Sequence, residues 1–95
     1  MKFTIDQPVF TEALRRVRFA TQGKIQNPIL SNVLIEAGAG SLILTATNID
    51  IRISIEVDAD VVEEGRITLP CERLHAISQQ VKGGKIAVAA GERFI

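Results

Sequence analysis

The chain has 95 residues, which is enough for one domain with a single hydrophobic core. Its net charge is zero, 46% of its residues are hydrophobic, and its four Phe are its only aromatic residues, so we expect a mainly aliphatic core. One cysteine excludes an intrachain disulfide. With no signal peptide at MKFTID and no apolar run of roughly 18–20 residues, we expect a cytoplasmic protein.

The first part of the chain predicts a strand and then a basic amphipathic helix. Residues 2–6 (KFTID) alternate apolar and polar, as in a half-buried strand. Asp6 can cap the helix and Pro8 suits its first turn. From Val9 to about Ala20, apolar residues recur at spacings of three and four, which predicts a helix. Its apolar side holds Phe10, Ala13, Leu14 and Val17, and its polar side holds Glu12, Arg15 and Arg16, with Arg18 on a flank.

Three strands are predicted next, after a loop at residues 21–28. They cover residues 29–36, 41–47 and 50–57. The segment AGAG (37–40) joins two of them. A glycine-rich loop that binds phosphate opens a helix, so we interpret AGAG as a hairpin turn.

A second strand–helix unit follows an acidic segment, residues 58–65, that we interpret as a loop. We expect a strand at 66–70, a helix at 71–81, a strand at 85–89 and the start of another at 93. The apolar stripe of this helix is Cys71, Leu74, Ile77, Ser78 and Val81, and its opposite side shows Glu72, Ala76 and Gln79.

The two halves repeat the same order of elements, and the second copy stops early. We therefore predict an α+β fold made of a duplicated β-α-β-β-β unit, with two helices on one face of a sheet and a truncated second copy. The side chains expected to pack between the helices and the sheet are Phe10, Leu14, Val17, Leu74, Ile77 and Val81, against Phe3, Ile5, Ile67 and Leu69.

The charges are sorted along the chain. Residues 1–26 hold five bases and two acids, whereas residues 50–64 hold six acids and one base. The simpler interpretation is two solvated faces of opposite charge. The alternative is an oriented molecule with one surface for a polyanion.

The basic helix face favours the second interpretation. Arg15 and Arg16 point away from the predicted core, and Lys24 lies on the loop after the helix, next to a glycine. Such side chains reach phosphates without reading bases. The second helix adds Arg73 and Gln79, with Gln80 and Lys82 beside them.

A catalytic or metal site is the weaker hypothesis. Cys71 and His75 stand four residues apart on one helix, the spacing of a Cys–His nucleophile pair. However, Cys71 falls on the apolar stripe, where a small buried side chain is the simpler interpretation. Two ligands are also too few for a zinc site. We expect no catalytic residue, no metal and no cofactor.

Several segments, in order and over the whole chain, resemble the bacterial DNA polymerase III beta subunit, the sliding clamp, in its N-terminal domain. They are MKFTID, NPILSNVLIEA (27–37), LTATNIDIRIS (44–54), EEGRITLPCERLHAI (63–77) and GERF (91–94). By this resemblance, residues 1–95 are an N-terminal clamp domain that is incomplete at its C-terminal end.

The resemblance implies a non-catalytic processivity factor. In that family two subunits close into a homodimeric ring around double-stranded DNA, with helices lining the pore, and tether DNA polymerase III after a clamp loader has acted. Lys24 occupies the position of a basic residue that touches the DNA backbone. Glu72 departs from the family, where a basic or neutral residue is common. The alternative is a stand-alone α+β protein-interaction module.

Overall fold

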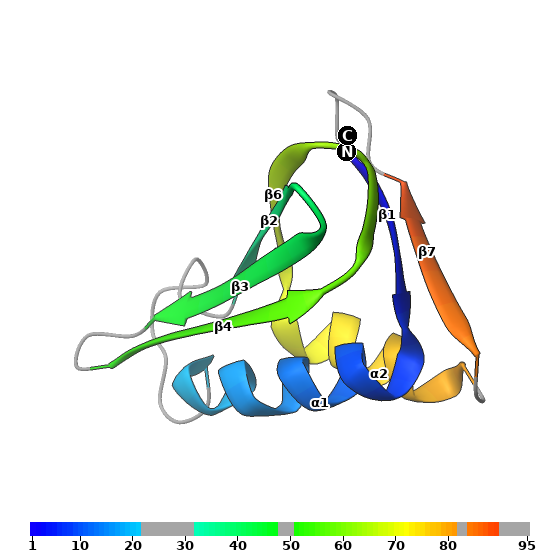
Figure 1. Ribbon diagram of the computed structural model, residues 1–95. Coiled ribbons are helices and arrows are strands. Elements are labelled where there is room, and N and C mark those ends of the chain that lie inside the picture. Colours follow the sequence, from blue (N-terminus) through cyan, green and yellow to red (C-terminus); the bar gives the residue numbers. More distant parts are fainter. Residues whose placement is uncertain (22–31, 48–50, 82–83, 90–95) are drawn as a thin grey trace.

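A computed structural model of the protein describes residues 1–21, 32–47, 51–81 and 84–89 (Figure 1). The first half contains β1 (Lys2–Asp6), α1 (Gln7–Val17), the 3₁₀ helix η1 (Arg18–Thr21), β2 (Asn32–Gly38), β3 (Ser41–Thr47), β4 (Arg52–Asp58) and β5 (Asp60–Glu63). The second contains β6 (Gly65–Pro70), α2 (Cys71–Gln80) and β7 (Lys85–Ala89). The predicted α+β fold is confirmed, and the strand expected from residue 93 lies outside the described residues.

The strands form two antiparallel sheets rather than the single sheet that we expected. One sheet has the order β5-β1-β7 and the other β4-β3-β2-β6. The two halves of the chain exchange strands between these sheets. The first strand of each half pairs with the strand that follows the helix of the other half, β1 with β7 and β2 with β6. This reciprocal pairing supports the duplicated unit.

The acidic segment that we predicted to be a loop contains a strand, β5, and that prediction was wrong. Its Val61 is half-buried against the core and pairs with Phe3 of β1. The ammonium group of Met1 also lies 3.1 Å from a Glu63 carboxylate oxygen. Only Ala59 separates β5 from β4, so this stretch passes from one sheet to the other (Figure 1). A single inward-facing valine in an acidic stretch is a weak sequence signal for a strand. The strand forms because its backbone pairs with β1, and the local sequence does not reveal that partner.

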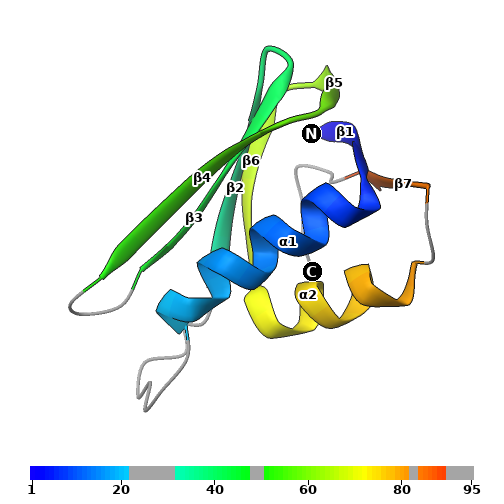
Figure 2. The same ribbon diagram turned by 60° about the horizontal axis from the view of Figure 1, so that its bottom comes forward.

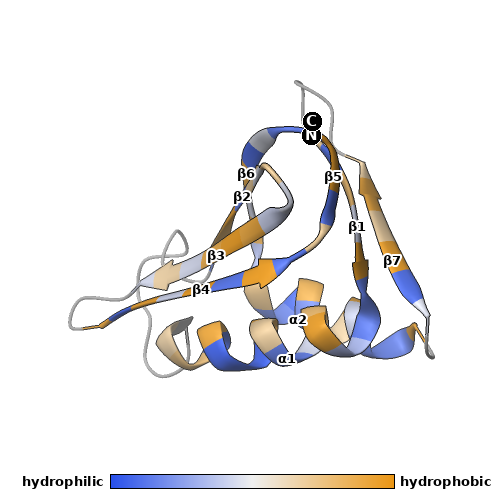
Figure 3. Cartoon of the chain, in the orientation of Figure 1, coloured by the Kyte–Doolittle hydropathy of each residue, from blue (hydrophilic) through white to orange (hydrophobic). Residues whose placement is uncertain are grey.

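The core lies between the helices and the strands and is mainly aliphatic, as expected. Leu14 and Val17 of α1 are fully buried, and so are Leu42 and Leu44 of β3. The rings of Phe3 and Phe10 meet edge to face with centroids 6.1 Å apart. Figure 3 shows the alternation of apolar and polar residues along β4, whose Ile53, Ile55 and Val57 pack against this core.

One residue expected in the core is on the surface. Ile77 is 58% exposed, while His75 is only 4% exposed. The buried residues of α2 are Cys71, His75 and Ser78. This face is rotated from the predicted stripe because α2 packs against α1, partly through polar side chains. Leu74, Val81, Ile67 and Leu69 are half-buried, and the other side chains predicted to pack there are buried.

The AGAG segment forms the predicted hairpin. Gly38 pairs with Ser41, which leaves Ala39 and Gly40 as a two-residue loop. Gly40 has φ of 76°, in the left-handed region that favours glycine.

We expect Gly40→Ala to lower the free energy of unfolding by about 1 kcal/mol, because an alanine is strained at that φ. Gly38→Ala is the matched control, since its φ is not positive and a Cβ there meets nothing within 4 Å. That control should change stability by less than about 0.5 kcal/mol. Urea denaturation measures both, and equal losses would contradict the conformational explanation.

Candidate nucleic-acid interface

The two helices lie side by side on the same side of the molecule, as predicted (Figure 2). They run antiparallel. Arg18, just after the end of α1, contacts Glu72 near the start of α2, and Gln7 at the start of α1 contacts Ser78 near the end of α2. The polar residues of both helices therefore contribute to one surface.

A chain of hydrogen bonds joins the helices at one end. The Gln7 side-chain amide donates to the carbonyl oxygen of Ser78 at 3.0 Å and to the Thr11 hydroxyl at 2.9 Å. Thr11 donates to the Ser78 hydroxyl at 3.0 Å, which donates to the carbonyl oxygen of His75 at 2.7 Å. Sequence reasoning missed these contacts because Ser78 fell on the apolar stripe, and only the pairing of the helices reveals its partners.

Arg18 joins the helices at the other end. Its Nη1 lies 3.0 Å from His75 Nδ1, and its Nε lies 3.1 Å from a carboxylate oxygen of Glu72. Since a guanidinium only donates, His75 Nδ1 accepts and the ring proton sits on Nε2. This buried Nε2 has no hydrogen-bond partner within the described ranges. Burial, and next the Arg18 charge, lower the pKa of His75, so the ring is neutral at pH 7.

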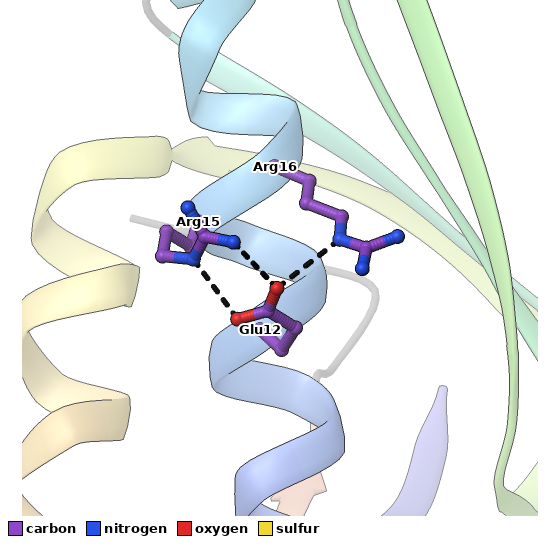
Figure 4. Close-up of polar contacts among 3 residues, drawn as sticks. All are labelled: Glu12, Arg15 and Arg16. Atoms are coloured by element: carbon purple, nitrogen blue, oxygen red, sulfur yellow. Dashed lines mark hydrogen bonds and ion pairs between the residues drawn. The ribbon is translucent and has the colours of Figure 1, made fainter.

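Glu12 holds the two neighbouring arginines of α1 (Figure 4). Its Oε2 accepts from Arg15 Nε at 2.9 Å, and its Oε1 accepts from Arg15 Nη2 at 2.6 Å and from Arg16 Nε at 3.1 Å. Hydrogen bonds from Arg15, and then from Arg16, lower the pKa of Glu12 to about 2. The same contact with Glu12 raises the pKa of Arg15.

Arg15 and Arg16 share Glu12 but lie on different sides of α1, whereas sequence reasoning placed them on one side. Arg15 lies on the side of α1 that is nearer α2 and turns its guanidinium toward Glu12, whereas Arg16 extends toward β4 (Figure 4). Arg16 lines a groove between α1 and β4 together with Ile55 and Val57. Of the two, Arg15 is therefore the one beside the surface that α1 and α2 share.

The other predicted residues have separate outcomes. Arg73 and Gln79 are exposed on α2, and Arg73 has no ion pair with any residue that the structure describes. Lys24 lies outside the described residues, so the structure does not place it. The helical elements α1, η1 and α2 contain four arginines and two glutamates, an excess of two positive charges.

The strand side carries the opposite charge. Five carboxylates within residues 52–64 are exposed: Glu56, Asp58, Asp60, Glu63 and Glu64. Arg52 is the only base in that stretch. The asymmetry along the sequence is therefore also an asymmetry between the helices and the strands β4 and β5.

The alternative chemistry has little geometric support. Cys71 is fully buried, as the apolar stripe predicted. No cluster of three or more His, Cys, Asp or Glu able to hold a metal occurs within residues 1–21, 32–47, 51–81 and 84–89. In the same ranges no helix has the length and apolar character to cross a membrane.

Comparison with known proteins gives a consistent match. Residues 1–94 match the family model of the DNA polymerase III beta subunit, N-terminal domain. The chain is 36% identical over 91 residues to the beta sliding clamp of Synechocystis, which covers 94% of the chain and 23% of the relative. The chain thus spans about a quarter of the length of its curated relatives.

Solved structures agree in fold. Caulobacter crescentus pol III beta superimposes with a TM-score of 0.89 at 31% identity, over 94% of this chain and 24% of that one. The Helicobacter pylori beta clamp bound to a DNA ligase peptide superimposes with a TM-score of 0.90, over 97% of this chain and 26% of that one. At 22% identity the latter supports the fold alone.

Proposed function

Because this chain belongs to the DNA polymerase III beta subunit family, through the N-terminal domain of that family, we propose that it forms part of a sliding clamp. In this proposal residues 1–95 contribute one domain to a homodimeric ring that encircles duplex DNA and tethers the replicative polymerase. The protein is cytoplasmic, non-catalytic and free of cofactors. The match to one domain of much longer relatives favours this proposal over a stand-alone interaction module.

The observation that carries the proposal is the opposite charge of the two sides. The helices bear an excess of arginine, and strands β4 and β5 bear exposed carboxylates. A polyanion such as DNA is attracted to the first and repelled by the second. The helical side is therefore the one that we assign to the DNA.

The candidate DNA contacts are Lys24, Arg15, Arg16, Arg73 and Gln79. Their side chains suit the phosphate backbone, and nothing in their types selects a base sequence. Binding of this kind is non-specific and compatible with sliding. DNA polymerase III and a clamp loader are the expected protein partners of the intact protein.

Lys24→Ala in the intact protein tests the assignment. We expect weaker binding to a short duplex with no change in sequence preference, because one phosphate contact is lost. The slope of log K against log salt concentration should become less steep, by roughly one unit or less. The measurement is a fluorescence titration at several salt concentrations.

Lys2→Ala is the matched control for Lys24→Ala. Lys2 is exposed at the start of β1, and the N-terminus lies at the end of the molecule away from the helices (Figure 1). Removing its charge should leave the salt slope unchanged. Tight, sequence-specific binding by the wild-type protein would contradict the clamp proposal as a whole.

A further inference from the structure

We propose that Glu12 is a built-in counterion that competes with DNA phosphates for Arg15 and Arg16 and so limits the affinity of the helical surface for duplex DNA. The inference rests on the proposed function, because it assigns that surface to DNA. The proposed function assigns basic residues that promote DNA binding. The present inference adds an acidic residue, Glu12, that opposes DNA binding.

The hydrogen bonds show what Glu12 occupies. An arginine has five N–H donors. Glu12 engages two of those of Arg15 and one of those of Arg16, using both of its carboxylate oxygens. The Nε and Nη2 pair of Arg15 is the fork that binds carboxylate or phosphate in a bidentate manner. A phosphate that approaches Arg15 along this edge must displace Glu12.

The charges show that this competition operates at physiological pH. The pKa of Glu12 is about 2, so the carboxylate is ionised at pH 7. The cluster of Glu12, Arg15 and Arg16 then carries one net positive charge instead of two. A duplex meets roughly half of the charge that the two arginines would otherwise present.

Exposure shows that the competition is reversible. The side chains of Glu12, Arg15 and Arg16 are 45%, 60% and 64% exposed. Ion pairs of such exposure are weak and screened by salt. A closely approaching phosphate can therefore exchange with Glu12 at small cost, and Glu12 reforms its bonds when the phosphate leaves.

A second carboxylate repeats the arrangement on α2. Glu72 lies 3.1 Å from Arg18, whose side chain is 29% exposed. Three of the four helical arginines thus have a carboxylate partner from α1 or α2, and Arg73 has none among the described residues. The pairing reduces the attraction of the surface while its guanidinium groups remain in place.

Glu12→Gln in the intact protein tests the inference, with Glu64→Gln as the matched control. Both variants remove one negative charge. Glu64 is exposed in the connection between β5 and β6, which lies away from the helices (Figure 1). The probe is a short fluorescent DNA duplex titrated between about 50 and 200 mM salt. Circular dichroism verifies that each variant is folded, and Glu12→Ala provides a second variant.

We expect Glu12→Gln to bind the duplex more tightly than wild type at low salt, with a salt slope steeper by about one unit because one more phosphate is engaged. The ratio of its duplex affinity to that of wild type should then shrink by a factor of about 3–4 between 50 and 200 mM salt. Glu64→Gln should keep the wild-type slope. In the Glu12→Gln background, Arg15→Gln should remove most of the gain.

The outcomes separate the inference from the function on which it rests. If wild type shows salt-dependent duplex binding but Glu12→Gln and Glu12→Ala both behave like Glu64→Gln, the counterion role is wrong and the proposed function stands. If wild type shows no salt-dependent binding to the duplex, the assignment of this surface to DNA is wrong. A gain that survives Arg15→Gln would refute the competition for Arg15.

Discussion

Replacing Leu14 by alanine is expected to lower the free energy of unfolding by about 2.7–5 kcal/mol. Leu14 is fully buried in α1 and belongs to the core shared by the helix and the strands. The loss combines the transfer energy of the removed methyl groups with the cavity that they leave. Since a small domain is stabilised by only about 5–15 kcal/mol, the variant should unfold at a much lower urea concentration.

Ile77→Ala is the control for this prediction. It removes a similar apolar side chain from a helix, but Ile77 is 58% exposed. A substitution at such a position changes stability by about 0.5 kcal/mol or less. If Ile77→Ala lowered the free energy of unfolding as much as Leu14→Ala, the buried face assigned to α2 would be wrong. The apolar stripe of α2 expected from the sequence, which includes Ile77, would then be right.

Acidification is expected to lower the stability of the protein by weakening the contact between Arg18 and His75 of α2. Its pKa is lowered, first by burial and then by Arg18. Protonation would put a cation next to the Arg18 guanidinium and remove the acceptor that lies 3.0 Å from Arg18 Nη1. Glu72 opposes this effect, and Arg15 adds to it. The neutral ring is thus the form that fits the folded protein.

The lowered pKa of His75 determines how stability changes with pH. The folded protein binds a proton at His75 less readily than the unfolded chain, whose histidine has the ordinary pKa of about 6.5. The stabilisation is fully present above about pH 6.5 and is lost as the pH falls through the lowered pKa. The slope from this one group is at most about 1.4 kcal/mol per pH unit.

His75→Gln is the variant that tests the acid effect. Its carbonyl oxygen can accept a hydrogen bond from Arg18, and it does not titrate. Urea midpoints measured from pH 8 to pH 5 should fall more steeply for wild type than for the variant. His75 is the only histidine in the chain, and Glu12, with a pKa of about 2, titrates below this window. Parallel curves would show that the proton on His75 has no effect on stability.

Local patterns in the sequence determined most of the elements. The alternation in residues 2–6 and the spacing of Phe10, Leu14 and Val17 predicted β1 and the buried face of α1 correctly. The segment AGAG also predicted its hairpin correctly. The conformation of a two-residue turn is set by the turn residues themselves, so a glycine there is a local signal. These features are decided within a few residues, so a single chain segment contains the information.

Only the tertiary structure decided the features that depend on partners far away in the chain. Val61 became part of a strand because β1 lies beside it. His75 took the place of Ile77 on the buried face of α2, next to the expected Ser78, because polar residues of α1 and η1 meet both side chains there. Likewise, Arg15 and Arg16 are adjacent in sequence, yet Arg15 lies on the side of α1 nearer α2 and Arg16 extends toward β4. Helical periodicity places them both on the polar side, but which neighbour each one reaches is set by the packing of α1 between α2 and the sheet.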